Sequence, residues 1–167
     1  LVDGDISAEV ISTDFDGMVA EGKKLSSIHP NIVVKVPMIK EGIKAIKWFT
    51  ENGIKTNCTL IFSAGQAILA AKAGATFVSP FVGRLDDQSV AGLEVVRSIS
   101  ELYRIHRIPT QVLSASIRSV QRAVRSWYNG AEVVTMPPSI FEQMYDHILT
   151  DKGLEIFERD AAGIKHD

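Results

Sequence analysis

The sequence has one cysteine, no apolar run long enough to cross a bilayer, and no excess of either charge, since 18 Lys and Arg oppose 20 Asp and Glu. One cysteine excludes a disulfide framework within the chain and is typical of a reducing compartment. A net charge of -2 gives no reason to expect nucleic acid or an anionic membrane as a partner. We therefore expect a cytoplasmic protein that binds neither.

Residues that hold metals are also sparse. The four histidines lie far apart and show no ligand spacing. Cys58 stands in an apolar, strand-like run, where a small buried hydrophobic residue is a better interpretation than a nucleophile. The sequence thus predicts no metal site.

The sequence does contain a regular alternation of strand and helix patterns. Its 167 residues, 46% of them apolar, suffice for one sizeable core, so we expect a single domain over 1–167. The predicted strands are 6–11, 31–37, 54–61, 76–81, 110–115 and 132–135. The first helix is predicted to follow an N-cap offered by Ser12-Thr13-Asp14 and to run through Met18 to about 27. Further helices are predicted at about 41–52, 66–72, 92–105 and 119–128, with one or two more between 138 and 160, and 83–89 is expected to be a polar loop. This alternation predicts an α/β fold with a parallel sheet under helical cover.

Lys35 interrupts the apolar strand 31–37, where lysine is rare. Val33 and Lys35 share one face of that strand, and the residues on either side of Lys35 take the other. In a barrel, Lys35 would point into the centre near the carboxyl end of its strand, where barrel enzymes keep their catalytic groups. Desolvation there would leave part of the lysine as a neutral amine that can attack a carbonyl. We interpret Lys35 as a Schiff-base lysine; the alternative is a lysine that reaches out to solvent.

Other polar side chains fall near the ends of neighbouring predicted strands. Glu9, Asn57 and Ser79 would converge on the same mouth as Lys35, whereas Arg84 and Arg118 follow later strands, where barrels often bind phosphate. Each has a structural alternative, as a salt bridge, a hydrogen-bonded core residue or a surface charge. Together, a lysine, a carboxylate and two arginines around one cavity predict carbonyl chemistry on a phosphorylated substrate.

Six segments carry a resemblance to a known family. They are Ser7-Ala-Glu-Val10, Val33-Val-Lys-Val-Pro37, Thr56-Asn-Cys-Thr-Leu-Ile-Phe-Ser63, Ala67-Ile-Leu-Ala-Ala-Lys-Ala-Gly-Ala75, Val78-Ser-Pro-Phe-Val-Gly-Arg-Leu-Asp-Asp87 and Ala115-Ser-Ile-Arg118. Together they resemble the transaldolase family, specifically its short bacterial and archaeal branch that includes fructose-6-phosphate aldolase. The resemblance runs over nearly the full sequence.

The resemblance implies a (β/α)8 TIM barrel of the class I aldolase type, of which this sequence represents about six β/α units. It implies that Lys35 attacks a ketose phosphate, such as sedoheptulose 7-phosphate or fructose 6-phosphate, and that a dihydroxyacetone unit passes to an aldose phosphate in the pentose phosphate pathway. Glu9 and Thr59 would share a water that shuttles protons during imine formation and breakdown. The implied substrate-binding residues are Asn57, Ser79, Phe81, Arg84, Ser116 and Arg118. No cofactor or metal is implied.

Two positions favour transaldolase over aldolase within the family. Aldolase members carry glutamine at the place of Glu9 and tyrosine at the place of Phe81. A phenylalanine beside the enamine gives water no partner for protonating it, so transfer to an aldehyde is favoured over release. The alternatives are a fructose-6-phosphate aldolase and a non-catalytic chain that binds sugar phosphates or a partner chain.

The resemblance also implies neighbours for this sequence. In the family a preceding segment supplies the first two strands and the aspartate that takes the hydroxyl proton in carbon–carbon cleavage, and no residue here is assigned that role. We therefore expect the sequence to belong to a longer barrel chain, with open sheet edges unless another segment fills the gap. Family members form rings of identical subunits, so we expect a homo-oligomer, for which an apolar stripe of Ile140, Met144 and Ile148 is suitable.

Overall fold

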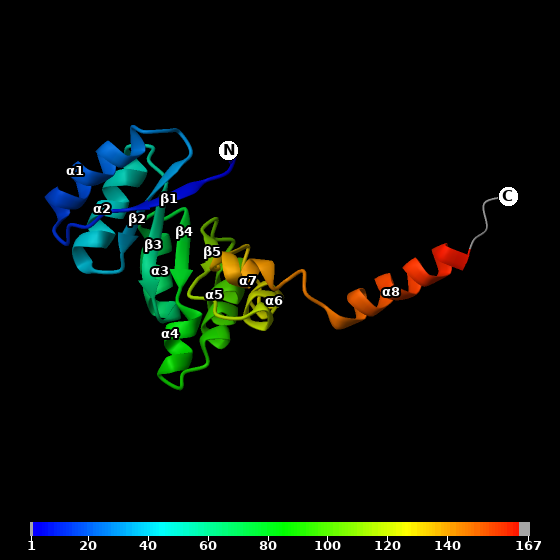
Figure 1. Cartoon of the computed structure of the whole chain (residues 1–167). Coiled ribbons are helices and arrows are strands. Elements are labelled where there is room, and N and C mark those ends of the chain that lie inside the picture. The colour runs from blue at the N-terminus through cyan, green and yellow to red at the C-terminus, as the bar shows by residue number, and fades with distance from the viewer. Residues whose placement is uncertain (1, 164–167) are drawn as a thin grey trace.

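Six parallel strands form one sheet in the order β1-β2-β3-β4-β5-β6 in this computed structural model, which describes residues 2–163. The strands are β1 (Ile6–Glu9), β2 (Ile32–Pro37), β3 (Thr56–Ile61), β4 (Phe77–Pro80), β5 (Gln111–Ser114) and β6 (Val133–Val134). Within the described residues β1 and β6 each pair with one neighbour and are edge strands. Sequential parallel strands with helical crossovers make a half-barrel, which confirms the predicted fold of six β/α units (Figure 1).

Helices alternate with the strands, and most of them cover the outer side of the sheet (Figure 1). They are α1 (Phe15–Ser26), α2 (Lys40–Glu51), α3 (Ala64–Lys72), α4 (Val82–Asp87), α5 (Gly92–His106), α6 (Val120–Tyr128), α7 (Pro138–Glu142) and α8 (Ile148–Gly163). Most begin and end within a few residues of the predicted positions. None of the helices in this part of the chain has the length and apolar content that a membrane span requires.

Capping side chains fix where three of these helices begin. Asp14, Ser63 and Ser119 each accept a hydrogen bond from the backbone N–H three residues further on, at the starts of α1, α3 and α6. Such caps satisfy backbone donors that have no partner within the helix. Because each of these helices follows a strand, its start also fixes the loop at the carboxyl end of that strand.

The core lies between the sheet and its helices. Val34 and Val36 of β2 are fully buried on the outer face, and Phe49 of α2 is fully buried with them. The approach of α1 to α2 depends on Gly22, because a Cβ at that position would come within 2.2 Å of Phe49 Cζ. Burying these apolar side chains is the main source of stability for the layer.

The prediction of a polar loop at 83–89 is wrong, since α4 occupies most of that segment. Val82 and Leu85 are three residues apart and both buried, so they form the short apolar face of a helix. The backbone N–H groups of Val82 and Gly83 donate to the carbonyls of the two residues that follow β5, at 3.0 and 3.1 Å. Six residues give too short a helical pattern to stand out among polar neighbours.

The prediction that Ile140, Met144 and Ile148 form one apolar stripe is also wrong, because these residues do not share a surface. Ile140 on α7 belongs to the buried core, whereas Ile148 at the start of α8 is 67% exposed. The reason is that α7 ends at Glu142, so helical spacing does not continue to α8. No residue of α8 is buried over Ile148–Gly163, and this helix extends away from the rest of the molecule (Figure 1).

Candidate functional site

Charged and polar side chains form a row across the inner face of the first strands. The strand register places Glu9 of β1 beside Lys35 of β2, and Lys35 beside Asn57 of β3. Residues that are paired in register point to the same face of a sheet. Three of the residues singled out from the sequence are therefore brought together by backbone pairing alone.

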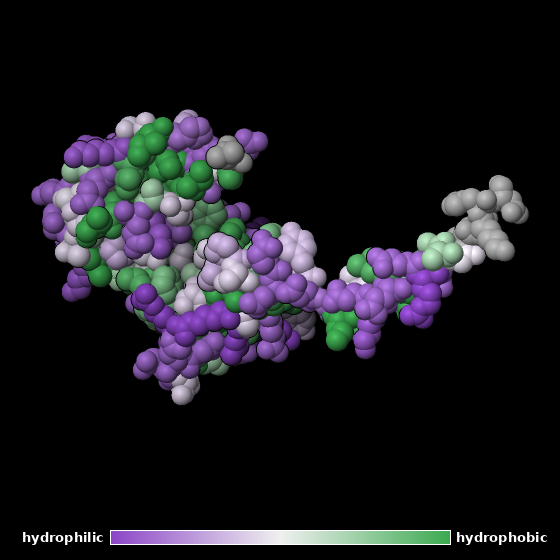
Figure 2. All heavy atoms as spheres, in the orientation of Figure 1, coloured by the Kyte–Doolittle hydropathy of each residue, from purple (hydrophilic) through white to green (hydrophobic). Residues whose placement is uncertain are grey.

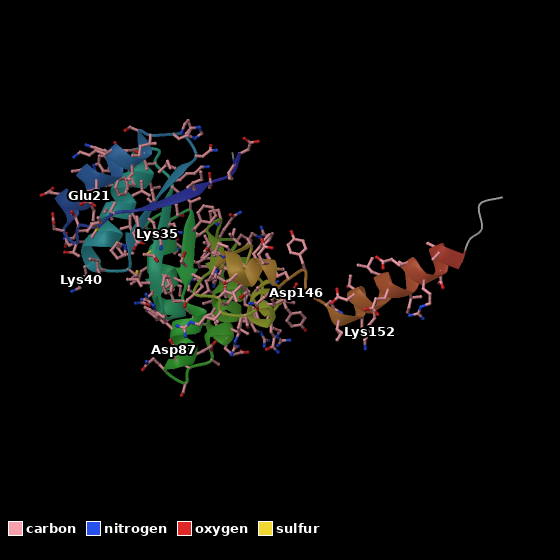
Figure 3. The ribbon with its side chains drawn as sticks, viewed as in Figure 1. Glu21, Lys35, Lys40, Asp87, Asp146 and Lys152 are labelled. Atoms are coloured by element: carbon pink, nitrogen blue, oxygen red, sulfur yellow. The ribbon has the colours of Figure 1, made fainter. Side chains whose placement is uncertain are left out.

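Lys35 is the central residue of this row and lies on the sheet itself (Figure 3). Its Nζ donates a hydrogen bond to Glu9 Oε2 at 2.9 Å. The Lys35 side chain is 24% exposed and that of Glu9 is 50% exposed. Val33 precedes Lys35 by two residues on the same face and is fully buried, so apolar surface lies below the lysine. The partial exposure of the Lys35 side chain leaves it reachable from solvent.

A hollow of about 100 Å³ lies over this part of the inner face. It is lined by Ser7, Lys35, Asn57, Ser79, Phe81, Leu113, Ala115 and Thr135. Four of these were predicted as site residues, whereas Ser7 and Thr135 were missed as polar lining residues. The place of Ser7 on this face could have been predicted from the sequence, because Ser7 precedes Glu9 by two positions and residues two apart on a strand share a face.

Asn57 is held at both ends of its amide group. Its Nδ2 donates to Ser7 Oγ at 3.1 Å, and its Oδ1 accepts from Ser79 Oγ at 2.7 Å. Asn57 and Ser79 are almost fully buried. These bonds join β1, β3 and β4 across the face and hold the amide group in place. The arrangement presents hydroxyl and amide groups to a polar ligand beside Lys35.

Thr59 follows Asn57 by two positions on β3 and is fully buried. Within residues 2–163 its Oγ1 has no hydrogen-bond partner. A bulge distorts the pairing of β3 with β4 here, and Leu60 adopts a φ of 60°. An unpaired buried hydroxyl costs about 1–3 kcal/mol. The oxygen is enclosed, and Thr59 does not line the hollow beside Lys35, so the structure does not bring this predicted residue to that hollow.

A larger hollow, of about 580 Å³, lies over α4. It is lined by Phe62, Arg84, Leu85, Asp87, Gln88 and Arg118. The guanidinium of Arg84 stacks over the Phe81 ring, with 5.0 Å from Cζ to the ring centroid. Phe81 also lines the hollow beside Lys35, so it stands between the two spaces. Both predicted phosphate-binding arginines therefore line one hollow.

Ser116 lies beside these arginines in the loop after β5. It lines a hollow of about 400 Å³ together with Arg118 and Thr135, among others. Its backbone carbonyl accepts from Gly83 N at 3.1 Å, which ties the loop to the start of α4. Ser116 adopts a φ of 59°, an uncommon conformation for a residue with a Cβ. The loop that carries Ser116 and Arg118 is thus anchored on α4.

Arg118 makes a two-pronged ion pair that the sequence analysis missed. Its Nη1 and Nη2 donate to the two carboxylate oxygens of Asp87 at 2.5 and 2.7 Å. The hydrogen bond and charge of Arg118 lower the pKa of Asp87, and Asp87 in turn raises the pKa of Arg118. Asp87 ends α4, and its role was hidden while 83–89 was interpreted as a loop.

The loop after Glu9 is held by a second carboxylate outside the predicted set. Glu21 on α1 accepts from Ile11 N at 2.6 Å and from Ser12 N at 3.2 and 3.3 Å, and Ser12 Oγ also donates to it. The Ser12 hydroxyl and the two backbone N–H groups lower the pKa of Glu21. Figure 3 shows Glu21 on α1 in the helical layer, away from Lys35.

The only cysteine lies on the opposite face of the sheet from Lys35. Cys58 is fully buried, which confirms its predicted place in the core, and burial raises its pKa to about 12. Its Sγ contacts Met38 Sδ at 3.7 Å. Within residues 2–163 no three His, Cys, Asp or Glu side chains come together as a possible metal group.

Comparisons with known proteins identify relatives over nearly the whole chain. The family described as Transaldolase/Fructose-6-phosphate aldolase matches residues 1–166. A probable transaldolase of Parabacteroides distasonis is 59% identical over 160 residues, which cover 96% of this chain and 73% of that protein. Probable transaldolases of Cytophaga hutchinsonii and Porphyromonas gingivalis are 56% and 54% identical over the same shares.

Among solved structures, a GMP reductase variant from Trypanosoma brucei, in complex with guanosine 5'-monophosphate, resembles this chain with a TM-score of 0.58. The sequences are 16% identical, and the match covers 81% of this chain and 30% of the reductase. At that identity the likeness supports the fold alone.

Proposed function

Because the chain belongs to the transaldolase/fructose-6-phosphate aldolase family, we propose that it is a transaldolase acting through a Schiff base on Lys35. It would transfer a dihydroxyacetone unit from a ketose phosphate, sedoheptulose 7-phosphate or fructose 6-phosphate, to an aldose phosphate. The observation that carries the proposal is the position of Lys35 between Glu9 and Asn57, on the floor of a polar hollow. The family supports a role in the pentose phosphate pathway. The single cysteine is consistent with the cytoplasm, a reducing compartment.

The proposed reaction begins when the neutral amine of Lys35 attacks the ketone carbon and water leaves, which forms an imine. A base then takes the proton of the C4 hydroxyl and the C3–C4 bond breaks, with its electron pair moving toward the imine. This releases an aldose phosphate and leaves C1 to C3 bound to Lys35 as an enamine. The enamine then adds to the aldehyde of the acceptor, and water releases the new ketose phosphate. We assign no residue of this chain to the base that takes the hydroxyl proton during cleavage.

Glu9 and Thr59 are proposed to move protons while the imine forms and breaks. Glu9 Oε2 lies 2.9 Å from Lys35 Nζ, close enough to exchange a proton with it directly or through one water. Thr59 lies on the same face of β3 as Asn57, and its Oγ1, which has no partner within residues 2–163, would be the hydroxyl that holds that water. The carboxylate would carry the proton, and the hydroxyl would orient the water.

The remaining site residues are proposed to bind the sugar phosphate. Asn57 and Ser79 would bind substrate hydroxyls, because both line the hollow beside Lys35 and their polar groups are already oriented. The phosphate would lie over α4, held by Arg84, Ser116 and Arg118. Phe81 lines the hollow beside Lys35 and stacks against Arg84 of the hollow over α4, so a ligand with a ketone at one end and a phosphate at the other would extend past Phe81.

A fructose-6-phosphate aldolase is the second candidate within the family. Transaldolase is favoured because the position beside the lysine is Phe81, whose ring packs at 5.9 Å from that of Phe62 and lies under Arg84. A phenylalanine there offers water no hydroxyl partner near the enamine. Turnover of fructose 6-phosphate without an aldose acceptor would identify an aldolase instead.

Borohydride trapping tests the proposal. Incubation with fructose 6-phosphate and borohydride, followed by peptide mass spectrometry, should place a reduced three-carbon or six-carbon adduct on Lys35. Lys35→Met should abolish the adduct. Lys55→Met is a matched control, because Lys55 also pairs with a carboxylate, Asp5, at 2.8 Å, but away from the hollow. A folded chain without an adduct on Lys35 would refute the enzymatic proposal and favour a non-catalytic sugar-phosphate-binding chain.

We also propose that the chain forms a homo-oligomer through α8. The helix exposes Ile148, Leu149, Leu154, Ile156 and Phe157, and Figure 2 shows hydrophobic atoms among the hydrophilic ones on its surface. Apolar side chains that the chain leaves exposed along a projecting helix are a suitable contact for another subunit. Leu149→Ser with Phe157→Ser should lower the mass found by light scattering, whereas Lys152→Ser on the same helix should leave it unchanged.

A further inference from the structure

Two adjacent carboxylates at the end of α4 bind two different arginines. Asp87 pairs with Arg118 through both carboxylate oxygens, at 2.5 and 2.7 Å. Asp86 pairs with Arg122 at 3.2 Å, and it also accepts from Gly92 N at 3.2 Å. Figure 3 shows Asp87 at the α4 end of the molecule. Of these two ion pairs, only that of Asp87 lies in the hollow that also contains Arg84.

The guanidinium of Arg118 is bound by Asp87 and lies close to the start of α4. Asp87 binds its two terminal nitrogens, and Nε lies over the start of α4, where a Cβ on Gly83 would come within 2.9 Å of it. An arginine has five N–H groups, and the bonds to Asp87 use two of them. Nε–H and the second N–H of each terminal nitrogen remain available. Asp87 thus orients the guanidinium and leaves donors for a second oxyanion.

We propose that Asp87 is a positioning residue that acts through Arg118 and sets the preference of the site for phosphorylated sugars. The inference rests on the proposed function, because it assigns a role within the phosphate end of that site. Arg118 and Asp87 are both about half exposed, so an unpaired Arg118 would have freedom to move. Holding the guanidinium in place lowers the conformational entropy that it loses when it binds phosphate.

If net charge alone decided phosphate binding, removal of the Asp87 carboxylate would strengthen that binding. The positioning role predicts weaker binding, so the direction of the change tests the proposal. Arg84, Arg118 and Asp87 give the hollow a formal charge of +1, since two arginines oppose one carboxylate. Removing the carboxylate charge raises this to +2, which on its own would tighten the binding of phosphate. These groups are exposed, so salt screens the charge effect, whereas the loss of orientation persists at any ionic strength.

Asp87→Asn provides the test, with Asp86→Asn as a neighbouring control that loses the same charge from the same helix. At near-physiological salt, Asp87→Asn should raise the KM for fructose 6-phosphate about 3- to 10-fold and change kcat by less than about 2-fold. The kcat/KM for unphosphorylated fructose should stay the same. Asp87→Glu, which keeps the carboxylate, should restore much of the KM. A KM that is unchanged or lower in Asp87→Asn would overturn the proposal.

A binding measurement separates this inference from the proposed function. Inorganic phosphate can be titrated into 15N-labelled protein while the arginine Nε signals are followed by NMR, which needs no catalysis. Weaker phosphate binding at the Arg118 signal in Asp87→Asn, but not in Asp86→Asn, supports the positioning role even if the wild-type chain traps no substrate. Equal binding in the two variants contradicts it even if the wild-type chain is an active transaldolase.

Discussion

The two faces of the sheet carry opposite kinds of side chain, although the same strands supply both. On the outer face Val34, Val36 and Cys58 are fully buried under the helices. On the inner face Lys35 and Asn57 alternate with them and line a polar hollow. Since successive residues of a strand point to opposite faces, one step along β2 or β3 moves from the core to the site.

This alternation separates stability from chemistry. The outer face gains free energy by removing apolar surface from water, and its residues are exchangeable for others of similar volume. The inner face contains an ion pair and a buried hydroxyl without a partner in residues 2–163, groups that contribute little to stability or reduce it. Substitutions on the two faces should therefore differ in what they damage, and matched pairs of variants can test this.

The largest contrast is expected between neighbouring residues of β2. Val36→Asp would place an unpaired carboxylate in a fully buried apolar layer, and we expect a loss of more than about 4 kcal/mol, enough to prevent folding. Lys35→Met should abolish borohydride trapping but change the free energy of unfolding by less than about 1 kcal/mol, because an exposed ion pair contributes little. Denaturant unfolding and trapping measured on both variants give the answer. A folded Val36→Asp protein would show that the outer face is not the stabilising one.

A large loss of stability with intact chemistry is expected from the helical layer. Phe49→Ala removes a fully buried ring that packs at Gly22, and it should lower the free energy of unfolding by about 3–5 kcal/mol. The exposed Leu69 on α3 is the control, since Leu69→Ala should stay within about 0.5 kcal/mol. At a temperature where Phe49→Ala remains folded, trapping at Lys35 should match that of the wild type. Loss of trapping in the folded variant would mean that the helical layer also shapes the site.

Much of the fold was predictable because its signals are local. Strand alternation, helix spacing and capping residues such as Asp14 identified the six β/α units, and alternation placed Lys35 and Asn57 on one face. What failed depended on tertiary contacts. Helix α4 is stabilised by bonds to the loop that follows β5, and no local sequence pattern indicates these bonds. The pairing of Asp87 with Arg118 joins residues 31 positions apart, so it depends on the tertiary fold and has no local sequence signal.

Thr56 and Thr59 of β3 lie on opposite faces of the sheet, so they allow the two faces to be compared within one strand. Thr56 and Thr59 are fully buried, and in the described part of the chain neither Oγ1 has a hydrogen-bond partner. Valine has nearly the same shape without the hydroxyl, so both Thr56→Val and Thr59→Val should leave the free energy of unfolding unchanged or raise it by about 1 kcal/mol. Only Thr59→Val should slow transfer, by roughly 10- to 100-fold, because its hydroxyl is proposed to orient the water beside Glu9. Equal transfer rates in the two variants would remove Thr59 from the proposed site.

The smallest effect should come from Glu21, which lies in the helical layer but holds the loop after the inner-face residue Glu9. Glu21 accepts from the Ser12 hydroxyl and from the backbone N–H groups of Ile11 and Ser12, and these bonds lower its pKa below its ordinary value of 4.5. A lowered folded-state pKa means that the stabilisation is present above pH 4.5 and is lost as the pH falls through the lowered value.

At neutral pH, Glu21→Gln should speed hydrogen exchange at Ile11 and Ser12 while exchange in the core of β3 stays the same. The control is Glu51→Gln on α2, which loses only a weak pair with Lys47 at 3.7 Å. If exchange in the loop stays slow in Glu21→Gln, the edge strand β1 holds Glu9 in place without help from α1. If exchange becomes faster and the rate of trapping at Lys35 falls with it, the separation of the two faces is incomplete at this edge.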